Sequence, residues 1–307
     1  MQKTTCELCP RKCYRSESNP GFCGAKEWAQ VALSLLHFWE EPPISGTKGS
    51  GTVFFSGCNL RCVYCQNHLI SVPKKNKNAT IKTFSQEIKP ADLSQIFFDL
   101  AAQGAHNINL VTPTPHIHQI RQALIIAKQA GLTLPVIYNS SAYENVAALR
   151  SLDGLIDVYL PDLKYINEAV AINYSQAPGY WPTASRAVLE MARQVNAITN
   201  KSFILDEQGL LKKGLLIRHL ILPGLRKDSM LILDWIANNL PKDTPVSLLA
   251  QYFPTHQAHL YQQINRKITA FEYNSIIEHF FSCGLTTGYM QKREAAQHNY
   301  VPDFSSQ

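Results

Sequence analysis

The chain has little charge and lacks any long apolar run. Only 17% of its 307 residues are charged, with a net charge of +6, whereas 45% are hydrophobic. Surface-dominated and disordered proteins carry more charge, so this composition predicts one main domain with a large core. No apolar stretch approaches the roughly 18 residues that cross a bilayer, and the chain opens with Met1-Gln2-Lys3 rather than an apolar signal segment. We therefore expect a soluble, cytoplasmic protein without a membrane partner.

Cysteine is nearly absent from most of the chain. Of the 8 cysteines, only Cys283 follows residue 65. Structural disulfides are rare in a reducing compartment, so the crowding of the other cysteines near the start predicts metal binding. Cys283 has no cysteine nearby in sequence, and we expect it to be a buried structural thiol.

The net positive charge is modest, and part of it is concentrated in one segment of the sequence. Much of it lies in the polar stretch from Lys74 to Lys82. Surfaces that bind single-stranded nucleic acid interleave basic residues with aromatic ones, which this stretch lacks. We expect a solvated loop here, while the basic balance leaves RNA open as a partner.

From residue 50 onward, short β-rich runs alternate with amphipathic helical patterns. Strands are expected at 52–56, 107–111, 135–138, 156–160, 215–222 and 246–251. Helices are expected at 91–102, 115–130, 143–149, 183–196, 229–239 and 270–281. Six βα units imply an α/β fold whose parallel sheet has right-handed crossovers. They are too few for an eight-fold barrel, so we favour a partial or open barrel, with ligands at the C-terminal ends of the strands.

The first 50 residues differ in kind, being dense in Cys, Pro and Gly and poor in periodicity. We therefore predict a small metal-binding appendage over residues 1–50 and the barrel domain over residues 51–307.

This appendage contains four cysteines, the number of ligands that a closed metal site needs. They are Cys6, Cys9, Cys13 and Cys23. Either structural zinc or a fully ligated iron–sulfur cluster would satisfy them, and the spacing does not choose. A cluster would be an electron conduit, whereas zinc would fold a segment too small to bury a core.

A second group of cysteines follows the first expected strand. Cys58, Cys62 and Cys65 supply three soft thiolates within eight residues. Closed tetrahedral zinc sites and fully ligated four-iron clusters each take four protein ligands. A compact group of three therefore indicates a cluster with one open iron. A zinc site completed by a distant histidine is the alternative.

The spacing Cys58-x3-Cys62-x2-Cys65, with Tyr64 before the last cysteine, resembles the cluster motif of the radical S-adenosylmethionine superfamily. The resemblance implies a radical-SAM-type partial (β/α)6 barrel and a [4Fe-4S] cluster on the three cysteines. S-adenosylmethionine would chelate the open iron, and an electron would cleave it to a 5′-deoxyadenosyl radical that abstracts hydrogen from the substrate. Tyr64 would pack near the adenine, with ordinary loop packing as the alternative.

Within this superfamily, the chain resembles the pyruvate formate-lyase activating enzymes over nearly its whole length, and specifically their longer relatives with an N-terminal cysteine motif. Besides the cysteines, the resemblance is carried by residues 41–51, 111–115, 138–141, 159–164 and 218–224. It implies an electron donor such as flavodoxin or ferredoxin.

The same resemblance implies roles for four polar residues. Asp162 and Lys164 look like the activating enzymes' Asp-x-Lys motif, in which Lys164 would neutralise the cofactor's carboxylate. Arg218 matches an arginine that reaches the cofactor, and Asn139 an asparagine near the site. The alternatives are a surface ion pair for Lys164, a buried pairing with a barrel carboxylate for Arg218, and an ordinary turn for Asn139.

The sequence also departs from the superfamily's pattern. The usual Gly-Gly-Glu segment, which binds the cofactor's amino group, is replaced by Thr112-Pro113-Thr114. Proline removes a backbone donor, so the amino group would rely on carbonyls or hydroxyls of Thr112 or Thr114. No histidine after the sixth strand matches the family cleanly, and His256 is expected to be a polar surface residue.

The main functional hypothesis is hydrogen abstraction from a protein or peptide, including activation of a glycyl-radical enzyme. The extra cysteines that known activases often carry after the triplet are missing, since only Cys283 follows Cys65. An RNA-modifying radical enzyme is one alternative. A non-catalytic module in which both cysteine groups hold zinc is the other.

Overall fold

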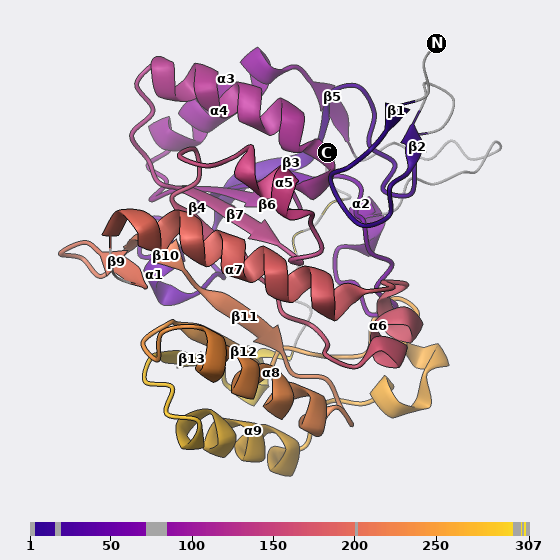
Figure 1. Cartoon of the computed structure of the whole chain (residues 1–307). Helices are drawn as coiled ribbons and strands as arrows, with labels where there is room; N and C mark the ends of the chain where they lie inside the picture. Colours follow the sequence, from indigo (N-terminus) through magenta and orange to yellow (C-terminus); the bar gives the residue numbers. More distant parts are fainter. Residues whose placement is uncertain are drawn as a thin grey trace.

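The computed structural model describes residues 4–15, 20–71, 85–199, 202–296, 302 and 304. The predicted loop from Lys74 to Lys82 lies outside these residues. Within them, Figure 1 shows strands at the centre of the molecule, with the longer helices on their outer side. Helices α3 and α4 lie beside one end of the row of strands and α8 and α9 beside the other, while the long α7 runs between them.

Eight strands form the larger sheet in the order β5-β3-β4-β6-β7-β8-β10-β9. Neighbours from β4 to β10 pair in parallel, whereas β3, β5 and β9 pair antiparallel at the two edges. In chain order the strands are β3 (Ala29–His37), β4 (Ser50–Phe55), β5 (Gln86–Ile88), β6 (Ile108–Val111), β7 (Val136–Ser140), β8 (Val158–Pro161), β9 (Phe203–Leu205) and β10 (Leu211–Leu215).

A three-stranded parallel sheet continues the larger one. Its strands are β11 (Ile217–Leu220), β12 (Val246–Leu249) and β13 (Gly288–Met290). Leu215 in β10 pairs with Tyr159. Arg218, which lies three residues after Leu215, pairs with Asp162 in the same register. Strands β10 and β11 therefore act as one long strand beside β8, and the parallel order runs without a break from β4 to β13.

Six of the helices lie where the apolar periodicity predicts them, whereas α1, α2 and α6 were not expected. In α4, for example, Ile117, Ile120, Leu124 and Ala127 share one face and are buried. The helices are α1 (Pro42–Ser45), α2 (His68–Ser71), α3 (Pro90–Ala102), α4 (Ile117–Gln129), α5 (Val146–Arg150), α6 (Glu168–Ser175), α7 (Tyr180–Thr199), α8 (Arg226–Asn239) and α9 (Ala270–Ser282), with 3-10 turns η1 (Thr114–His116), η2 (Ala258–Leu260), η3 (Gln262–Ile264) and η4 (Arg293–Ala295).

The predicted α/β class with a mainly parallel sheet is thus confirmed, and each of the six expected strands and six expected helices is present. Strand β3 was not expected, because the first 50 residues read as aperiodic. It pairs along its length with β4, so the boundary proposed at residue 50 falls between two paired strands. The division into a metal-binding segment and a barrel stays a prediction.

The segment before β3 packs on the end of the sheet where the parallel strands finish. Strands β1 (Thr4–Thr5) and β2 (Tyr14–Arg15) form a short antiparallel pair. The carbonyl of Leu8 accepts a hydrogen bond from the Asn145 amide at 3.0 Å. Arg11 Nε donates to the carbonyl of Asn59 at 2.6 Å. The first cysteine group is therefore held against the loop that carries the second.

Candidate functional site

One cavity of about 610 Å³ lies at the C-terminal ends of the parallel strands. It extends down to the end of β3, where Glu40 and Glu41 line it. Nine of the predicted site residues line it, drawn from the ends of β4, β6, β7 and β8 and from β11. They are Cys58, Cys62, Tyr64, Cys65, Thr112, Asn139, Asp162, Lys164 and Arg218.

The loop of the three cysteines is fixed by backbone contacts. Gly57 has φ +85°, and its amide donates to the Ile70 carbonyl at 2.8 Å. The amides of Arg61 and Val63 donate to the carbonyls of Ser175 and Tyr174 at 2.9 and 2.8 Å. The loop is thereby tied to α6 on one side and to α2 on the other, which points the cysteines into the cavity.

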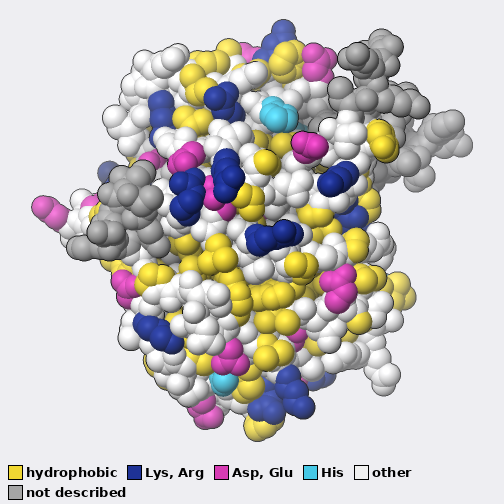
Figure 2. All heavy atoms as spheres, viewed as in Figure 1, with side chains coloured by type: hydrophobic (Ala, Val, Ile, Leu, Met, Phe, Trp, Pro, Cys, Tyr) yellow, Lys and Arg dark blue, Asp and Glu magenta, His cyan; other side chains and the backbone are white. Residues whose placement is uncertain are grey.

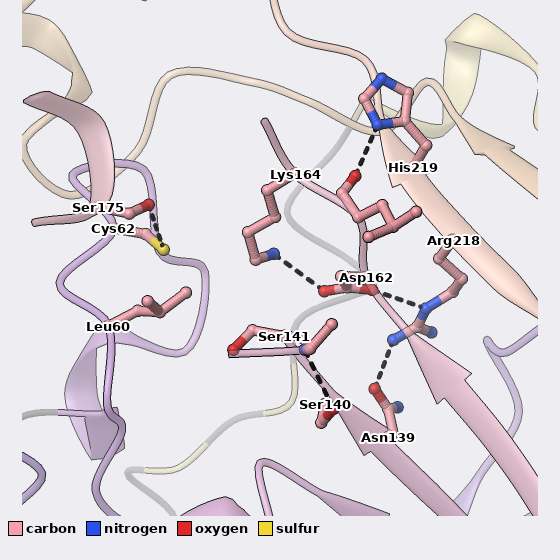
Figure 3. Close-up of polar contacts among 12 residues, drawn as sticks. Leu60, Cys62, Asn139, Ser140, Ser141, Asp162, Lys164, Ser175, Arg218 and His219 are labelled. Atoms are coloured by element: carbon pink, nitrogen blue, oxygen red, sulfur yellow. Dashed lines mark hydrogen bonds and ion pairs between the residues drawn. The ribbon is translucent and has the colours of Figure 1, made fainter. Parts of the chain in front are cut away.

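The three cysteines suit a ligand that supplies positive charge. Burial raises the pKa of Cys58 to about 12 and that of Cys65 to about 11, and it also raises the pKa of Cys62. Without a cation the thiols therefore stay protonated. The Ser175 hydroxyl donates to Cys62 Sγ at 3.0 Å (Figure 3), which fixes that side chain.

The three sulfurs are not all as close together as they would be around a single zinc ion. Two sulfurs that bind one zinc ion at about 2.3 Å lie at most about 4.6 Å apart. Among the described residues, the only three Cys, His, Asp or Glu ligand atoms that all lie within 4.8 Å of one another belong to Asp234, His279 and Cys283. At least one pair of sulfurs in the triplet therefore lies more than 4.8 Å apart.

Charged side chains form a chain across the same cavity. Lys164 Nζ donates to one oxygen of Asp162 at 2.9 Å, and Arg218 Nε donates to the other at 3.1 Å (Figure 3). The remaining Arg218 nitrogens donate to Glu40 at 2.8 Å and to Asn139 at 2.7 Å. Arg218 therefore holds groups from β3, β7 and β8 in fixed positions, the buried pairing that the sequence left open as its alternative.

The charges of this network are mutually stabilised. Burial alone would raise the pKa of Asp162, but the adjacent Lys164 and Arg218 hold it below its usual range. Burial likewise works against the charged form of Lys164, and Asp162 reverses this to raise the pKa of the amine. Asp162 therefore stays a carboxylate and Lys164 stays an ammonium in the buried wall of the cavity. Lys164 can thus present a fixed positive charge there.

His219 supports the loop that carries this pair. Its Nδ1 lies 2.7 Å from the Leu163 carbonyl oxygen and its Nε2 lies 2.8 Å from the Ser229 hydroxyl. Figure 3 shows the ring on the outer side of the loop, away from the cavity. Sequence reasoning noted His219 only as part of a family segment, and its position directly after Arg218 was the available signal.

Tyr64 lies in an aromatic wall beside the cysteines. It is buried, and its hydroxyl shares a hydrogen bond with that of Tyr165. The ring of Tyr252 packs edge-on against it with centroids 5.8 Å apart. Both Tyr64 and Tyr252 line the cavity, so this wall offers a flat apolar surface next to the triplet.

The two threonines of the turn after β6 lie in different surroundings. Thr112 lines the cavity with φ +59°, a left-handed backbone conformation that is rare for a β-branched residue. Thr114 lies in the 3-10 turn and is not among the residues that line the cavity; its hydroxyl donates to Glu144 at 2.7 Å. Burial raises the pKa of Glu144 to about 7.

Sequence reasoning missed two carboxylates at the lower end of the cavity. Glu40 accepts hydrogen bonds from Arg218 and, at 2.9 Å, from Asn109. Glu41 is buried, its nearest oxygen lies 3.9 Å from Arg218 Nη1, and burial raises its pKa. The segment that begins at Glu41 was noted for its family resemblance, which was the one signal available.

The N-terminal cysteines surround a second, much smaller cavity of about 20 Å³. Cys6, Cys9, Cys13 and Cys23 all line it, together with Arg11. Burial raises the pKa of Cys9 to about 11. The structure therefore brings together the four residues that the sequence predicted as one site.

Two other predicted features lie apart from both cavities. Cys283 is half-buried rather than buried, and its sulfur contacts Asp234 at 3.3 Å in the group with His279. His256 is exposed, as expected, and its ring stacks on that of His68 with centroids 4.7 Å apart.

A curated relative of Methanocaldococcus jannaschii, the uncharacterized protein MJ0674, is 31% identical over 277 residues, which is 89% of this chain and 73% of the relative. The chain belongs to the family of MJ0674. A second uncharacterized protein of that organism, MJ0808, is 21% identical over 260 residues, 80% of this chain and 69% of its own length. No protein-family model matches the chain.

Solved structures that align with part of this chain include Streptococcus suis SuiB and a domain of a pyruvate-formate lyase-activating enzyme from Bacteroides vulgatus. SuiB bound to its precursor peptide SuiA aligns with a TM-score of 0.48 and 11% identity over 76% of this chain and 46% of SuiB. SuiB bound to S-adenosylmethionine aligns with a TM-score of 0.48 and 10% identity over 76% of this chain and 48% of SuiB. The chain thus spans less than half the length of SuiB.

The activating-enzyme domain aligns with a TM-score of 0.41 and 13% identity over 58% of this chain and 92% of the domain. Both neighbours are radical S-adenosylmethionine enzymes, the superfamily that the cysteine motif resembles. With TM-scores below 0.5, these likenesses carry no conclusion about the chemistry of this chain. No helix among the described residues is long and apolar enough to span a membrane.

Proposed function

We propose that the protein is a radical S-adenosylmethionine enzyme whose strands β4 to β12 form a partial barrel of the radical-SAM type. One observation carries the proposal: a three-cysteine group and a buried lysine–aspartate pair line the same cavity. Cys58, Cys62 and Cys65 leave one iron of a four-iron cluster without a protein ligand. Lys164 supplies a fixed positive charge next to Cys62, where a carboxylate on that iron would lie.

When bound, the [4Fe-4S] cluster and S-adenosylmethionine supply a carbon-centred 5′-deoxyadenosyl radical able to abstract hydrogen. The protein's own groups position and enclose them. Tyr64 and Tyr252 offer the apolar wall for the adenine and exclude water beside the cysteines. Thr112 holds a strained backbone at the cavity wall, and such strain is concentrated at functional sites. We assign the cofactor's amino group to its backbone carbonyl or its hydroxyl.

In this proposal Arg218 and Asn139 do not contact the cofactor directly but position residues that do. Arg218 already donates to Asp162, Glu40 and Asn139. Its guanidinium therefore fixes Asp162, and Asp162 in turn fixes Lys164. This makes Arg218 a positioning residue rather than the direct cofactor contact that the family resemblance implies. Thr114, which faces Glu144, has no part in the site.

For the substrate we propose a protein or peptide. Trp39 lines the cavity and is 59% exposed, so it marks where the cavity opens to solvent. Its neighbour Phe38 is 50% exposed. An exposed aromatic side chain at a cavity mouth, such as that of Trp39, is suited to anchor a peptide side chain. The substrate's reacting carbon would enter past Trp39 towards the cofactor, and the electron would come from a donor such as flavodoxin or ferredoxin.

An RNA substrate gains little support from the face of the molecule drawn in Figure 2. On the face in Figure 2, Lys and Arg side chains lie among Asp, Glu and apolar groups, rather than in one basic stripe. Binding of RNA that weakens steeply with salt would favour the RNA alternative over a peptide.

The decisive experiment is anaerobic purification and iron–sulfur reconstitution, followed by reduction in the presence of S-adenosylmethionine. We expect a brown protein that releases 5′-deoxyadenosine. The Lys128→Met variant is a suitable control, because Lys128 pairs with Asp157 on the outer side of the fold, away from the cavity. Protein that binds only zinc and has no brown colour would support the non-catalytic module and overturn the proposal.

A further inference from the structure

Glu41 is a buried carboxylate without a hydrogen-bond partner. Its side chain is 6% exposed and lines the large cavity. Neither oxygen accepts a hydrogen bond from any residue that the structure describes. Arg218 Nη1 lies 3.9 Å away, beyond hydrogen-bond distance, and Ser247 affects the pKa of Glu41 without donating a hydrogen bond to it. A carboxylate buried in this way is unfavourable for folding, which points to a ligand that supplies the missing donor.

The local backbone does not explain why a carboxylate stands at this position. Glu41 is the N-cap residue of α1, but its side chain makes no capping hydrogen bond. Its backbone carbonyl instead accepts hydrogen bonds from the amides of Ile44 and Ser45, at 2.8 and 3.1 Å. Any residue could provide that carbonyl, so the start of the helix does not require a glutamate.

The preceding residue, Glu40, shows what a structural carboxylate looks like in the same cavity. Its two oxygens accept hydrogen bonds from Arg218 at 2.8 Å and from Asn109 at 2.9 Å. The other nitrogens of Arg218 donate elsewhere, so the guanidinium is already engaged on all three nitrogens. Glu41 therefore differs from its neighbour in having its charge directed at the cavity rather than at the protein.

The charges of the cavity wall do not balance. Three carboxylates and two cations line the cavity among the described residues, namely Glu40, Glu41, Asp162, Lys164 and Arg218. His37 lies there too, but burial lowers its pKa and favours the neutral ring. Asp162 and Glu40 each pair directly with Arg218, at 3.1 and 2.8 Å. The carboxylate left over is Glu41, so the group that complements it should carry positive charge.

The surroundings of Glu41 suit a cation on a long apolar stem. Arg218 pairs across the strands with Ser247 in β12, and Ser247 pairs with Tyr289 in β13. Burial and the charge of Glu41 together raise the pKa of Tyr289, so this ring lies close to the carboxylate. Trp39 lines the same cavity at its opening, two residues before Glu41. Aromatic rings next to a carboxylate favour a cation, and they cover the apolar part of its side chain.

This part of the cavity is distinct from the part assigned above to the cofactor. Lys164, beside the cysteines, contacts Asp162, and Asp162 contacts Arg218, which has Glu41 on its other side. The cavity measures about 610 Å³, whereas pockets for single small ligands begin at about 300 Å³. A cofactor held at the cysteines thus leaves room for a side chain at Glu41.

We propose that Glu41 binds the cationic head of a lysine or arginine side chain of the peptide substrate. The apolar stem of that side chain lies along Tyr289 and Trp39. Anchored in this way, a neighbouring carbon of the peptide is held in the cavity on the side of the cysteines. This inference rests on the proposed function for the choice of a peptide, and it adds the kind of residue that the peptide must contain.

Binding of short peptides to the reconstituted full-length protein tests the proposal. The probes are acetylated and amidated Gly-Lys-Gly and Gly-Arg-Gly, each with a neutral counterpart that contains norleucine or citrulline. In anaerobic equilibrium dialysis the charged peptides should bind at least tenfold more tightly than the neutral ones, as expected for one charge-assisted contact. Glu41→Gln should remove this preference. Equal binding of charged and neutral peptides by the wild type would overturn the proposal.

Glu87→Gln is the control for the loss of one negative charge. Glu87 pairs with Lys26 and does not line the cavity. Its variant should keep the preference for the charged peptides. Loss of the preference in Glu87→Gln as well would mean that the net charge of the protein, rather than Glu41, attracts the peptides, and would overturn the proposal.

Stability separates a binding carboxylate from a structural one. Glutamine has nearly the shape of glutamate but no charge to leave unpaired, so Glu41→Gln should unfold in urea at the same midpoint as the wild type or a higher one. Glu40→Gln should have a lower midpoint, because it weakens the contact with Arg218. A lower midpoint in Glu41→Gln would show that the carboxylate supports the fold and would overturn the proposal.

The cofactor is the other molecule that could reach Glu41. A tenfold loss of affinity for S-adenosylmethionine in Glu41→Gln would assign the carboxylate to the cofactor, which overturns this inference and leaves the proposed function intact. If instead the reconstituted wild type holds no iron–sulfur cluster and releases no 5′-deoxyadenosine, the proposed function fails. A preference for charged peptides that depends on Glu41 would still stand in that case, because it requires no radical chemistry.

Discussion

The two cysteine groups differ in number, surroundings and available space. Three cysteines line a cavity of about 610 Å³, whereas four surround one of about 20 Å³. Next to the triplet, Lys164 and Asp162 lie in the cavity wall. Next to the N-terminal group lies Arg11, stacked on Phe22. A missing ligand is thus accompanied by room for a second molecule, while a complete ligand set is accompanied by almost none.

This contrast shows how one chain can use the same thiolate chemistry for two purposes. A metal centre that does chemistry on another molecule needs an open position, and one that folds a segment or carries an electron needs a closed one. The contact between Gly57 and Cys23 places both kinds side by side. Breaking the two groups separately is therefore informative.

The largest effect is expected from Cys58→Ser. Loss of one of three thiolates should abolish cleavage of S-adenosylmethionine, at least a 1000-fold loss or about 4 kcal/mol in rate, because the cluster then lacks a firm attachment. Cys283→Ser is the control, since Cys283 lies outside both cavities. Release of 5′-deoxyadenosine and iron content measure both variants. Near-normal activity in Cys58→Ser would contradict the assignment of the open cluster.

The next effect is expected from Gly57→Ala, which separates the two groups. The side chain would be forced into a left-handed backbone and against the Cys23 carbonyl, so we expect a loss of about 3 kcal/mol of stability. Gly131→Ala is a matched control, because Gly131 has φ +94° with nothing within 4 Å of its added Cβ. Its loss should be near 1 kcal/mol.

Anaerobic urea unfolding, followed by tryptophan fluorescence, compares the midpoints of these variants. The metal content of the N-terminal site should fall in Gly57→Ala and stay unchanged in Gly131→Ala. Equal midpoints would mean that the contact between the groups is easily relaxed.

Much of the main domain could be predicted because its signals are local. Strands β6, β8 and β12 on the parallel path are short apolar runs, and α4 repeats buried residues at helical spacing. The triplet also lies within eight residues, so its spacing alone indicates a cluster. Strand β3 was missed because only its first half is fully buried, which breaks the alternation expected of a strand.

The polar network could be predicted only in part, because its contacts are distant in sequence. Asp162 and Lys164 stand two residues apart and were found together. Glu40 and Arg218 are separated by 178 residues, so no spacing links them. Thr114 was assigned to the cofactor from its position after β6. The 3-10 turn instead directs its hydroxyl to Glu144, a choice that depends on a buried partner 30 residues away.

A third prediction concerns the floor of the N-terminal site, where Thr114 lines the small cavity and is bound to Glu144. Burial raises the pKa of Glu144 from 4.5 to about 7. Between these values the folded protein binds a proton that the unfolded chain has released, so stability is greatest at low pH and falls as pH rises towards 7. The loss should be about 2 to 3 kcal/mol between pH 5 and pH 8.

Glu144→Gln should remove this dependence while keeping an acceptor for the Thr114 hydroxyl. Urea midpoints measured from pH 5 to pH 8 compare the two proteins. Glu168→Gln, at an exposed residue of α6, controls for the loss of one charge. Parallel pH profiles for the wild type and Glu144→Gln would show that the carboxyl group does not titrate in this range.

The smallest effect is expected from Lys164→Met, which leaves all the cysteines in place and removes the positive charge beside Cys62. Asp162 keeps its partner Arg218, so the fold should be little affected. The affinity for S-adenosylmethionine should fall about tenfold, or about 1.4 kcal/mol, as for the loss of one charge-assisted hydrogen bond. Equilibrium binding to the reconstituted protein measures this, with Lys128→Met as the control. The metal content of both cysteine groups should not change. A loss of metal from either group would mean that Lys164 stabilises the cysteine loop rather than the cofactor.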